Sequence, residues 1–357
     1  MNFKELKKRL ADGGRLEDKE AIELFSSDDL FSLGELANYL CEKKNKNIKY
    51  FSRNMHINPG NICINRCKFC AFSKSAGEEG AYSYTIDEMV QKAKEMKGKV
   101  SELHIVGGLN PEMDLKFYSE LFTSVKHAVP TVLIKALTAV EIDYISTTSG
   151  STVKHVLKVL RSAGLDTMPG GGAEIFKSGV RSRLCPEKIN ARRWLQIMET
   201  AHKTGIKTNA TMLFGHLESY SDRVDHMRRL RNLQDKTGGF LAFIPLPFHA
   251  KNTDITESHP VSGIDILKTI AISRIYLDNF DHIKAYWIMT GEKLAQTALL
   301  FGADDLDGTV IEEKITHAAG GKTKESMSVE EIAALIKKAG KKPVERDSFY
   351  RKLRTWN

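Results

Sequence analysis

From residue 47 onward, short runs of apolar residues alternate with stretches in which apolar positions recur at helical spacing. This order predicts repeated β–α units and a parallel sheet. The apolar runs predict eight strands: Met55–Ile62, Glu102–Val106, Val132–Leu137, Leu165–Pro169, Lys207–Phe214, Phe240–Pro245, Ile283–Met289 and Asp305–Thr309. Eight units within about 250 residues fit a closed (β/α)8 barrel of the α/β class. A doubly wound open sheet is the alternative, because periodicity does not show closure.

Helix-start signals stand between the predicted strands. Thr85 and Glu88 form a capping-box pattern, and Ser151 and Asn190 stand where two further helices begin. Ser328, followed by Val-Glu-Glu, marks the start of a late helix.

The chain divides most simply into one catalytic barrel with helical additions. We expect an N-terminal helical extension over residues 1–50, a barrel over residues 51–310, and a C-terminal helical extension over residues 311–357 that packs on the barrel. The sequence has no solenoid repeat and no linker rich in Gly, Ser or Pro.

Composition narrows the class of protein. A chain of 357 residues that is 41% hydrophobic and 27% charged suits a globular protein. It lacks both a long uncharged apolar run and a signal-peptide start, so we expect a cytoplasmic protein that does not enter a membrane. The net charge of +8 suggests nucleic-acid binding, but the basic residues are spread over predicted helix faces. We therefore expect no nucleic-acid partner, and small anionic substrates explain the charge equally well.

Three of the five cysteines fall within eight residues, directly after the first predicted barrel strand. Cys63, Cys67 and Cys70 have the spacing C-x3-C-x2-C. They suit either a zinc ion with His56 as a fourth ligand, or a [4Fe–4S] cluster that leaves one iron open. A position at the rim of a barrel, where active sites lie, favours the cluster. The spacing, with Phe69 before the last cysteine, resembles the motif of the radical S-adenosylmethionine (SAM) superfamily. That resemblance implies reductive cleavage of SAM to methionine and a 5′-deoxyadenosyl radical.

Glycines and acids end the next strands. Gly107 and Gly108 end the second strand; alone they indicate a tight turn, with N–H groups left free for a ligand. By position they resemble the superfamily motif that binds the methionine amino group. Glu174 follows three glycines after the fourth strand and is a candidate for a ribose hydroxyl or an ammonium group, although a mobile loop is the alternative. Glu141, beyond the third strand, is a further candidate for a polar contact with SAM.

The fifth strand supplies the remaining candidates. Asn209 and Thr211 share one face of it, so we expect them to line the barrel mouth near SAM. His216 follows a glycine at the end of this strand, where it could transfer a proton or bind an anion as a catalytic residue. A histidine that only ties down its loop is the alternative.

Four longer stretches resemble aminodeoxyfutalosine synthases, a radical SAM family of menaquinone biosynthesis. They are PGGGAEIF, TNATMLFGHLES, DNFDHIKAYWIM and GADDLDGTVIEEKITH, and the resemblance covers nearly all of the chain after about residue 50. It implies that the 5′-deoxyadenosyl radical adds to 3-[(1-carboxyvinyl)oxy]benzoate to give 6-amino-6-deoxyfutalosine, bicarbonate and methionine. It also implies one three-cysteine [4Fe–4S] cluster, SAM as co-substrate, and an electron donor such as flavodoxin or ferredoxin.

The substrate so implied carries two carboxylates. Lys135, Arg181, Arg183 and Lys284 are candidate cations for them. Two alternatives within the superfamily are a cyclic dehypoxanthine futalosine synthase and a deazaflavin synthase. An alternative of another class is a basic, zinc-containing RNA-binding module.

Overall fold

A curled parallel sheet forms the centre of the molecule. The computed structural model describes residues 2–258 and 260–356. In this part of the chain seven strands pair in sequence order and all in parallel. They are β2 (Asn54–Ile57), β3 (Glu102–Ile105), β4 (Leu133–Ala136), β5 (Leu165–Met168), β6 (Lys207–Phe214), β7 (Phe240–Pro247) and β8 (His282–Ile283). The predicted α/β barrel is therefore confirmed.

The predicted eighth strand joins the barrel in an unexpected way. It is β9 (Asp305–Gly308), which pairs with β1 (Ile48–Ser52) in a second sheet of order β11-β10-β1-β9. The backbone of this segment also bridges β8, between Lys284 and Asp305, and β2, between Met55 and Ile311. These two single bridges span the gap between the first and last strands of the seven-stranded sheet.

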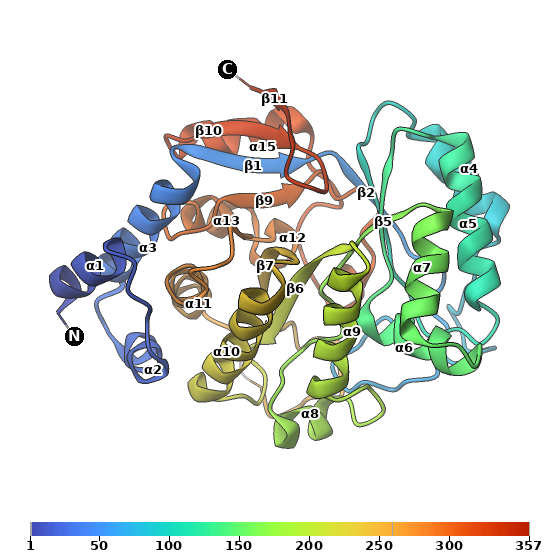
Figure 1. Cartoon of the computed structure of the whole chain (residues 1–357), viewed down its shortest axis with the longest axis horizontal. Coiled ribbons are helices and arrows are strands. Elements are labelled where there is room, and N and C mark those ends of the chain that lie inside the picture. The colour runs from blue at the N-terminus through green and yellow to red at the C-terminus, as the bar shows by residue number, and fades with distance from the viewer. Residues whose placement is uncertain (1, 259, 357) are drawn as a thin grey trace.

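Helices surround the curled sheet on its outer side (Figure 1). Those that follow the strands are α4 (Ile86–Glu95), α5 (Leu115–Ala128), α6 (Ala139–Thr148), α7 (Val153–Ala163), α8 (Ser178–Leu184), α9 (Ala191–Lys203), α10 (Tyr220–Thr237), α11 (Gly263–Tyr276), α12 (Trp287–Thr290), α13 (Glu292–Ala298) and α14 (Ile315–Ala318). Among the described residues, no helix is both long and apolar enough to cross a membrane.

The predicted helix starts are largely confirmed. Thr85 and Glu88 form the capping box of α4, Asn190 caps α9, and Ser328 starts α15 (Val329–Lys338) with a capping box. The start of α7 was misplaced by one residue, because Thr152 rather than Ser151 accepts the N–H of His155.

Two predicted strands are shorter than expected. The first ends at Ile57, and the loop that follows carries the cysteines. The one predicted as Ile283–Met289 is a strand only at His282–Ile283, and its second half turns into α12.

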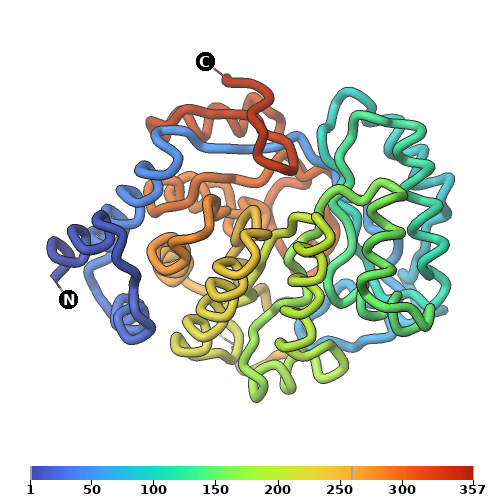
Figure 2. Tube along the Cα trace, in the orientation of Figure 1, coloured from blue at the N-terminus to red at the C-terminus, as the bar shows by residue number. Residues whose placement is uncertain are grey.

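The segments on either side of the barrel meet it differently. The N-terminal one contains α1 (Phe3–Ala11), α2 (Asp18–Ser26) and α3 (Leu30–Asn45) before β1 begins at Ile48, and α2 and α3 pack on α10 and α11. The C-terminal one contains α15 but also β10 (Lys342–Arg346) and β11 (Lys352–Thr355), which helical periodicity missed. Figure 2 shows the red strand β10 beside the blue strand β1, with which it pairs in parallel.

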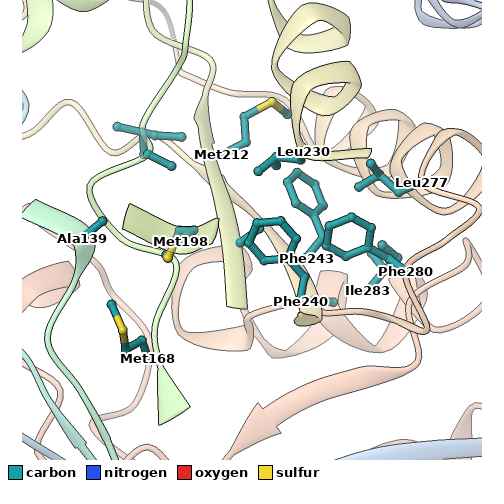
Figure 3. Packing of buried hydrophobic residues seen from close by; sticks show 14 of the residues in the cluster. Ala139, Met168, Met198, Met212, Leu230, Phe240, Phe243, Leu277, Phe280 and Ile283 are labelled. Carbon is teal, nitrogen blue, oxygen red and sulfur yellow. The ribbon is translucent and has the colours of Figure 1, made fainter. Parts of the chain in front are cut away.

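Aromatic side chains fill the layer between the sheet and its outer helices. Phe240 and Phe243 on β7 contact Phe280, with ring centroids 5.4 and 6.3 Å apart, respectively. Leu230 on α10 and Met212 on β6 complete this part of the core (Figure 3). This packing holds the strands rigidly, so their carboxyl ends present side chains in fixed positions.

Candidate active site

One cavity of about 340 Å³ lies at the carboxyl ends of the barrel strands. Among the residues the structure describes, it is lined by every predicted site residue except His216: Cys63, Cys67, Cys70, Gly107, Gly108, Glu141, Glu174, Asn209 and Thr211. The structure thus brings together side chains from five separate strand–loop junctions, as expected for a barrel active site.

The cysteine loop forms one wall of this cavity. Its three thiols are free, and Cys67 is the most buried of them, with 7% of its surface exposed. The loop is held by backbone hydrogen bonds, from Cys63 to Lys74 and from Cys70 to Cys67. Burial raises the pKa of the Cys67 thiol to about 12, so a thiolate there needs a cation beside it.

These cysteines fit a [4Fe–4S] cluster. Three thiols on one wall of a cavity are the donor set of a cube that keeps its fourth iron open to a ligand. His56, the fourth ligand of the zinc alternative, lies on β2 and packs against His104. In residues 2–258 and 260–356, no three His, Cys, Asp or Glu side chains are grouped so as to hold a single metal ion.

The loop after β3 packs directly against the cysteine loop. A Cβ atom on Gly108 would lie 2.2 Å from the carbonyl oxygen of Ile62 and 3.0 Å from the Cβ of Cys63. Only glycine therefore permits this contact. The N–H groups expected to be free are both paired: Gly107 donates to Glu141 at 3.2 Å and Gly108 to the carbonyl of Gly60 at 3.0 Å.

Glu141 connects this loop to the start of α6. One carboxylate oxygen accepts the N–H of Gly107 and the other accepts the N–H of Thr138, the residue that caps α6. Burial raises the pKa of Glu141 to about 7, despite these hydrogen bonds. An ammonium group entering the cavity would therefore meet a carboxyl that ionises readily in its presence.

Glu174 forms an ion pair with Lys188, a residue that the sequence analysis missed. The ammonium nitrogen of Lys188 lies 2.7 Å from Oε1 of Glu174 and 4.8 Å from the ring centroid of Phe69 in the cysteine loop. Burial opposes ionisation of Glu174, but Lys188 outweighs it and lowers the pKa of this carboxyl. No pattern marks Lys188 in the sequence, because it lies in an irregular segment between α8 and α9.

Beneath the cavity lies an ion cluster, formed by Glu102, Lys135, Lys284, Asp305, Asp307 and Arg346. Lys135 lies 2.7 Å from both carboxylate oxygens of Glu102, and Lys284 lies 2.5 Å from Asp307. Arg346, from β10, donates to Asp305 at 2.8 Å. The cluster thus contains three ion pairs between a cationic side chain and a carboxylate. Although burial opposes it, the neighbouring cations lower the pKa of Glu102 to about 2.

Two of the four candidate cations reach the cavity. Lys135 and Lys284 line it. Arg181 is buried elsewhere and donates to four backbone carbonyls, among them those of Gly172 and Ala173, so it supports the glycine-rich loop. Arg183 is exposed and pairs with Glu257.

His216 lies outside the cavity lining in the described part of the chain. Its Nε2 lies 3.0 Å from the carbonyl oxygen of Leu213, and its Nδ1 lies 2.7 Å from the backbone nitrogen of Leu217 and 2.9 Å from Glu218. Both ring nitrogens are therefore occupied within the turn after β6. This geometry favours a role in holding that turn, and a catalytic role for His216 stays a prediction.

Comparison with known families agrees with the cysteine loop and the barrel. Residues 57–230 match the family model described as the radical SAM superfamily, and residues 237–356 match the CofH/MqnC C-terminal region. The chain belongs to the radical SAM superfamily. This radical SAM enzyme is of the transferase type and uses a [4Fe–4S] cluster and SAM, a small-molecule substrate and a reductant. These matches favour a radical SAM enzyme over the zinc-containing RNA-binding module.

Two kinds of curated relative are similar to this radical SAM enzyme. An aminodeoxyfutalosine synthase from Thermus thermophilus is 43% identical over 98% of this chain and 95% of its own length. Another, from Streptomyces coelicolor, is 41% identical over 99% of this chain and 94% of its own. A 5-amino-6-(D-ribitylamino)uracil–L-tyrosine 4-hydroxyphenyl transferase from Methanoculleus marisnigri is 38% identical over 95% and 94%, respectively.

Solved structures share the fold of this radical SAM enzyme. Methylornithine synthase superposes with a TM-score of 0.78 at 17% identity, over 95% of this chain and 97% of its own. The FeFe-hydrogenase maturase HydG from Carboxydothermus hydrogenoformans gives a TM-score of 0.76 at 17% identity, over 98% of this chain and 80% of its own.

Proposed function

We propose that this radical SAM enzyme is an aminodeoxyfutalosine synthase of menaquinone biosynthesis. It joins the 5′-deoxyadenosyl group of SAM to 3-[(1-carboxyvinyl)oxy]benzoate and releases 6-amino-6-deoxyfutalosine, bicarbonate and methionine. The observation that carries the proposal is the identity of 41–43% to two aminodeoxyfutalosine synthases over almost the whole chain.

The cavity supports a substrate with two carboxylates. Lys135 and Lys284 bring ammonium groups to its inner end, and Leu246, Phe248 and Tyr286 give apolar surface beside them. Apolar walls with a few fixed charges orient an aromatic acid and exclude water from a radical.

In this proposal the loops divide the work of holding the cofactor. Cys63, Cys67 and Cys70 bind the [4Fe–4S] cluster, which supplies the electron that cleaves SAM. Glu141 accepts hydrogen bonds from the methionine ammonium group of SAM. Glu174, kept ionised by Lys188, accepts hydrogen bonds from the ribose hydroxyls.

Asn209 and Thr211 on β6 complete the wall beside the nucleoside in the same proposal. The hydroxyl of Thr211 donates to the carbonyl of Gly170 at 2.7 Å, which fixes the glycine-rich loop against β6. We propose a small redox protein such as flavodoxin or ferredoxin as the electron donor.

A second candidate function rests on the relatives named as tyrosine 4-hydroxyphenyl transferases. Their identity to this chain, 38–39%, is only slightly lower than that of the aminodeoxyfutalosine synthases. That reaction uses L-tyrosine and 5-amino-6-(D-ribitylamino)uracil.

One anaerobic experiment separates the two. Cluster-loaded enzyme is given SAM labelled in its adenosine, a chemical reductant, and either the enol-ether benzoate or the tyrosine and uracil pair. We expect the label in a product of the mass of 6-amino-6-deoxyfutalosine with the first mixture only. Label solely in free 5′-deoxyadenosine, together with a new product from the second mixture, would establish the alternative function.

A further inference from the structure

Two histidines pack together at the inner end of the cavity, with their ring planes tilted by 52°. His56 on β2 and His104 on β3 are register partners, and their ring centroids lie 4.5 Å apart. Lys135 is the register partner of His104 on the next strand, β4. All three side chains line the cavity, so they form one row across neighbouring strands. The cysteine loop follows β2 and therefore lies at the outer end of the same cavity.

The row has hydrogen-bonding capacity that the protein does not use. His56 is 4% exposed, and its Nε2 has no hydrogen-bond partner among the described residues. A buried polar atom without a partner destabilises a protein by about 1–3 kcal/mol unless a ligand or water satisfies it. Lys135 and Lys284 differ from His56, because the ammonium group of each lysine is already paired with an acid of the ion cluster.

Both imidazoles are neutral at ordinary pH. Burial lowers the pKa of His56, and it lowers that of His104 well below its usual value. Glu313, Asp307 and Glu102 act in the opposite direction on the pKa of His56, and Lys135 lowers it. His56 and Lys135 lower the pKa of His104 further, whereas Glu102 and Asp307 raise it. A neutral imidazole offers one N–H donor without adding a charge. Such an imidazole can therefore donate a hydrogen bond to a carboxylate beside the ion cluster, whose three cations and three acids offset each other in charge.

We propose that His56 and His104, together with Lys135, form the subsite for the aromatic carboxylate of the substrate. This inference rests on the proposed function. The enol-ether carbon of the substrate must lie near the adenosyl group at the cysteine loop, so the opposite end of the molecule extends inward. That end is the benzoate group, and its carboxylate meets the row of His56, His104 and Lys135. The two imidazole rings also give flat surfaces against which the benzoate ring packs.

The test combines variants with substrates. His56→Phe and His104→Phe keep a flat ring but remove the nitrogens, and His155→Phe on the exposed face of α7 is the matched control. The substrates are the enol-ether benzoate and its analogue 2-phenoxyacrylate, which lacks the aromatic carboxylate. Because a hydrogen bond to a charged group is involved, each variant should raise the KM for the benzoate about 10- to 100-fold. Cluster content should be unchanged, as should KM for the analogue relative to the wild type.

Equal losses with both substrates, or no loss with either, would overturn the subsite. A binding experiment separates that failure from failure of the proposed function. Calorimetric titration of the cluster-loaded enzyme, with SAM present, compares 3-hydroxybenzoate with 3-hydroxybenzamide. We expect the wild type to prefer the carboxylate and His104→Phe to lose that preference. If the wild type does not prefer it, the subsite is wrong whatever product the enzyme makes. If the wild type prefers 3-hydroxybenzoate but forms no coupled product, only the proposed function fails.

Discussion

Cys67 differs from the other two cysteines of the loop in its surroundings. It is buried against the barrel, whereas Cys63 and Cys70 are only half-buried. A thiolate in that position is stable only beside a cation, and iron would supply one. We therefore expect Cys67 both to ligate the cluster and to fix it against the buried side of the loop.

We predict that Cys67→Ala loses most of its iron and no longer cleaves SAM. Iron and sulfide analysis after anaerobic reconstitution, followed by measurement of 5′-deoxyadenosine, tests this. Cys185→Ala is the matched control, because Cys185 is also buried but lies outside the cavity lining in the described residues. About four iron and four sulfide per chain in Cys67→Ala would refute the assignment.

Glu141 makes the stability of the protein depend on pH. Its pKa is about 7 in the folded state and lies near 4.5 in the unfolded chain. Between these two pH values the carboxyl is ionised in the unfolded chain but still protonated in the folded protein. The stabilisation that the neutral carboxyl gives to the folded state is therefore fully present below pH 4.5 and is lost as the pH rises to about 7.

We therefore predict that Glu141→Gln gains stability relative to the wild type as the pH rises from 5 to 7. Anaerobic denaturant unfolding of both proteins at several pH values measures the difference. The comparison cancels the other groups that titrate in this range, buried histidines included. A constant difference between the two proteins across the range would contradict the prediction.

At the scale of elements, the loop after β3 and the loop after β2 form one unit. Gly108 is the point of contact, and the backbone of Ile62 leaves no room for a side chain there. The glycines of this loop were predicted to face the methionine group of SAM. In the structure Gly108 packs against the segment that leads into Cys63, and its contact with SAM stays a prediction.

We predict that Gly108→Ala lowers both cluster content and SAM affinity, because the added methyl group displaces the cysteine loop. Gly179→Ala in α8 is the control, since nothing lies within 4 Å of its Cβ position. Iron analysis and equilibrium binding of SAM measure the two effects. A variant with full cluster content and weakened SAM binding would show that Gly108 faces the ligand.

Strands were predictable from sequence where they are buried on both faces. The runs at β3, β5 and β6 were found with nearly correct bounds because both faces of each strand pack inside the protein. The run at 283–289 failed because its apolar residues continue into α12, and a buried helix turn looks the same in sequence as a buried strand.

The site was predictable where it carries a motif or where a residue's place on a strand or just beyond it puts it at the barrel mouth. Cysteine spacing and glycine runs located the two loops, since few other arrangements use them. Lys188 could not be found, and His56 was considered only as a zinc ligand, because the importance of both comes from what the fold places beside them. His216 is a different case: its position in sequence suggested the cavity, the structure places its ring in the turn after β6, and its catalytic role stays a prediction.

At the scale of the whole molecule, both sheets contribute residues to the ion cluster that supports the active site. The ion cluster beneath the cavity takes members from β3, β4, β9 and β10 and from the end of β8. The second sheet contributes Asp305 and Asp307 from β9 and Arg346 from β10, and Arg346 interacts with all three acids of the cluster. The C-terminal strands are therefore part of the support of the cavity.

We predict that Arg346→Met lowers the free energy of unfolding by about 3–5 kcal/mol, because it leaves a buried carboxylate of Asp305 unpaired. Arg351→Met is the control: its ion pair with Asp347 is largely exposed on the arginine side, so its loss should change stability by less than about 1 kcal/mol. Anaerobic denaturant unfolding measures both, and similar losses would contradict the prediction. The double variant Arg346→Met/Asp305→Asn should recover part of the loss.

The position of Arg346 in the chain also has a consequence for how the protein is made. Synthesis proceeds from the N-terminus, so every strand of the seven-stranded sheet is complete before Arg346 is added. Until then Glu102, Asp305 and Asp307 have only two lysines to balance them inside the barrel. A nascent chain can thus carry the entire cysteine loop while its barrel interior still has an excess negative charge. The ion cluster that supports the cavity is therefore completed only after β10 has been synthesised.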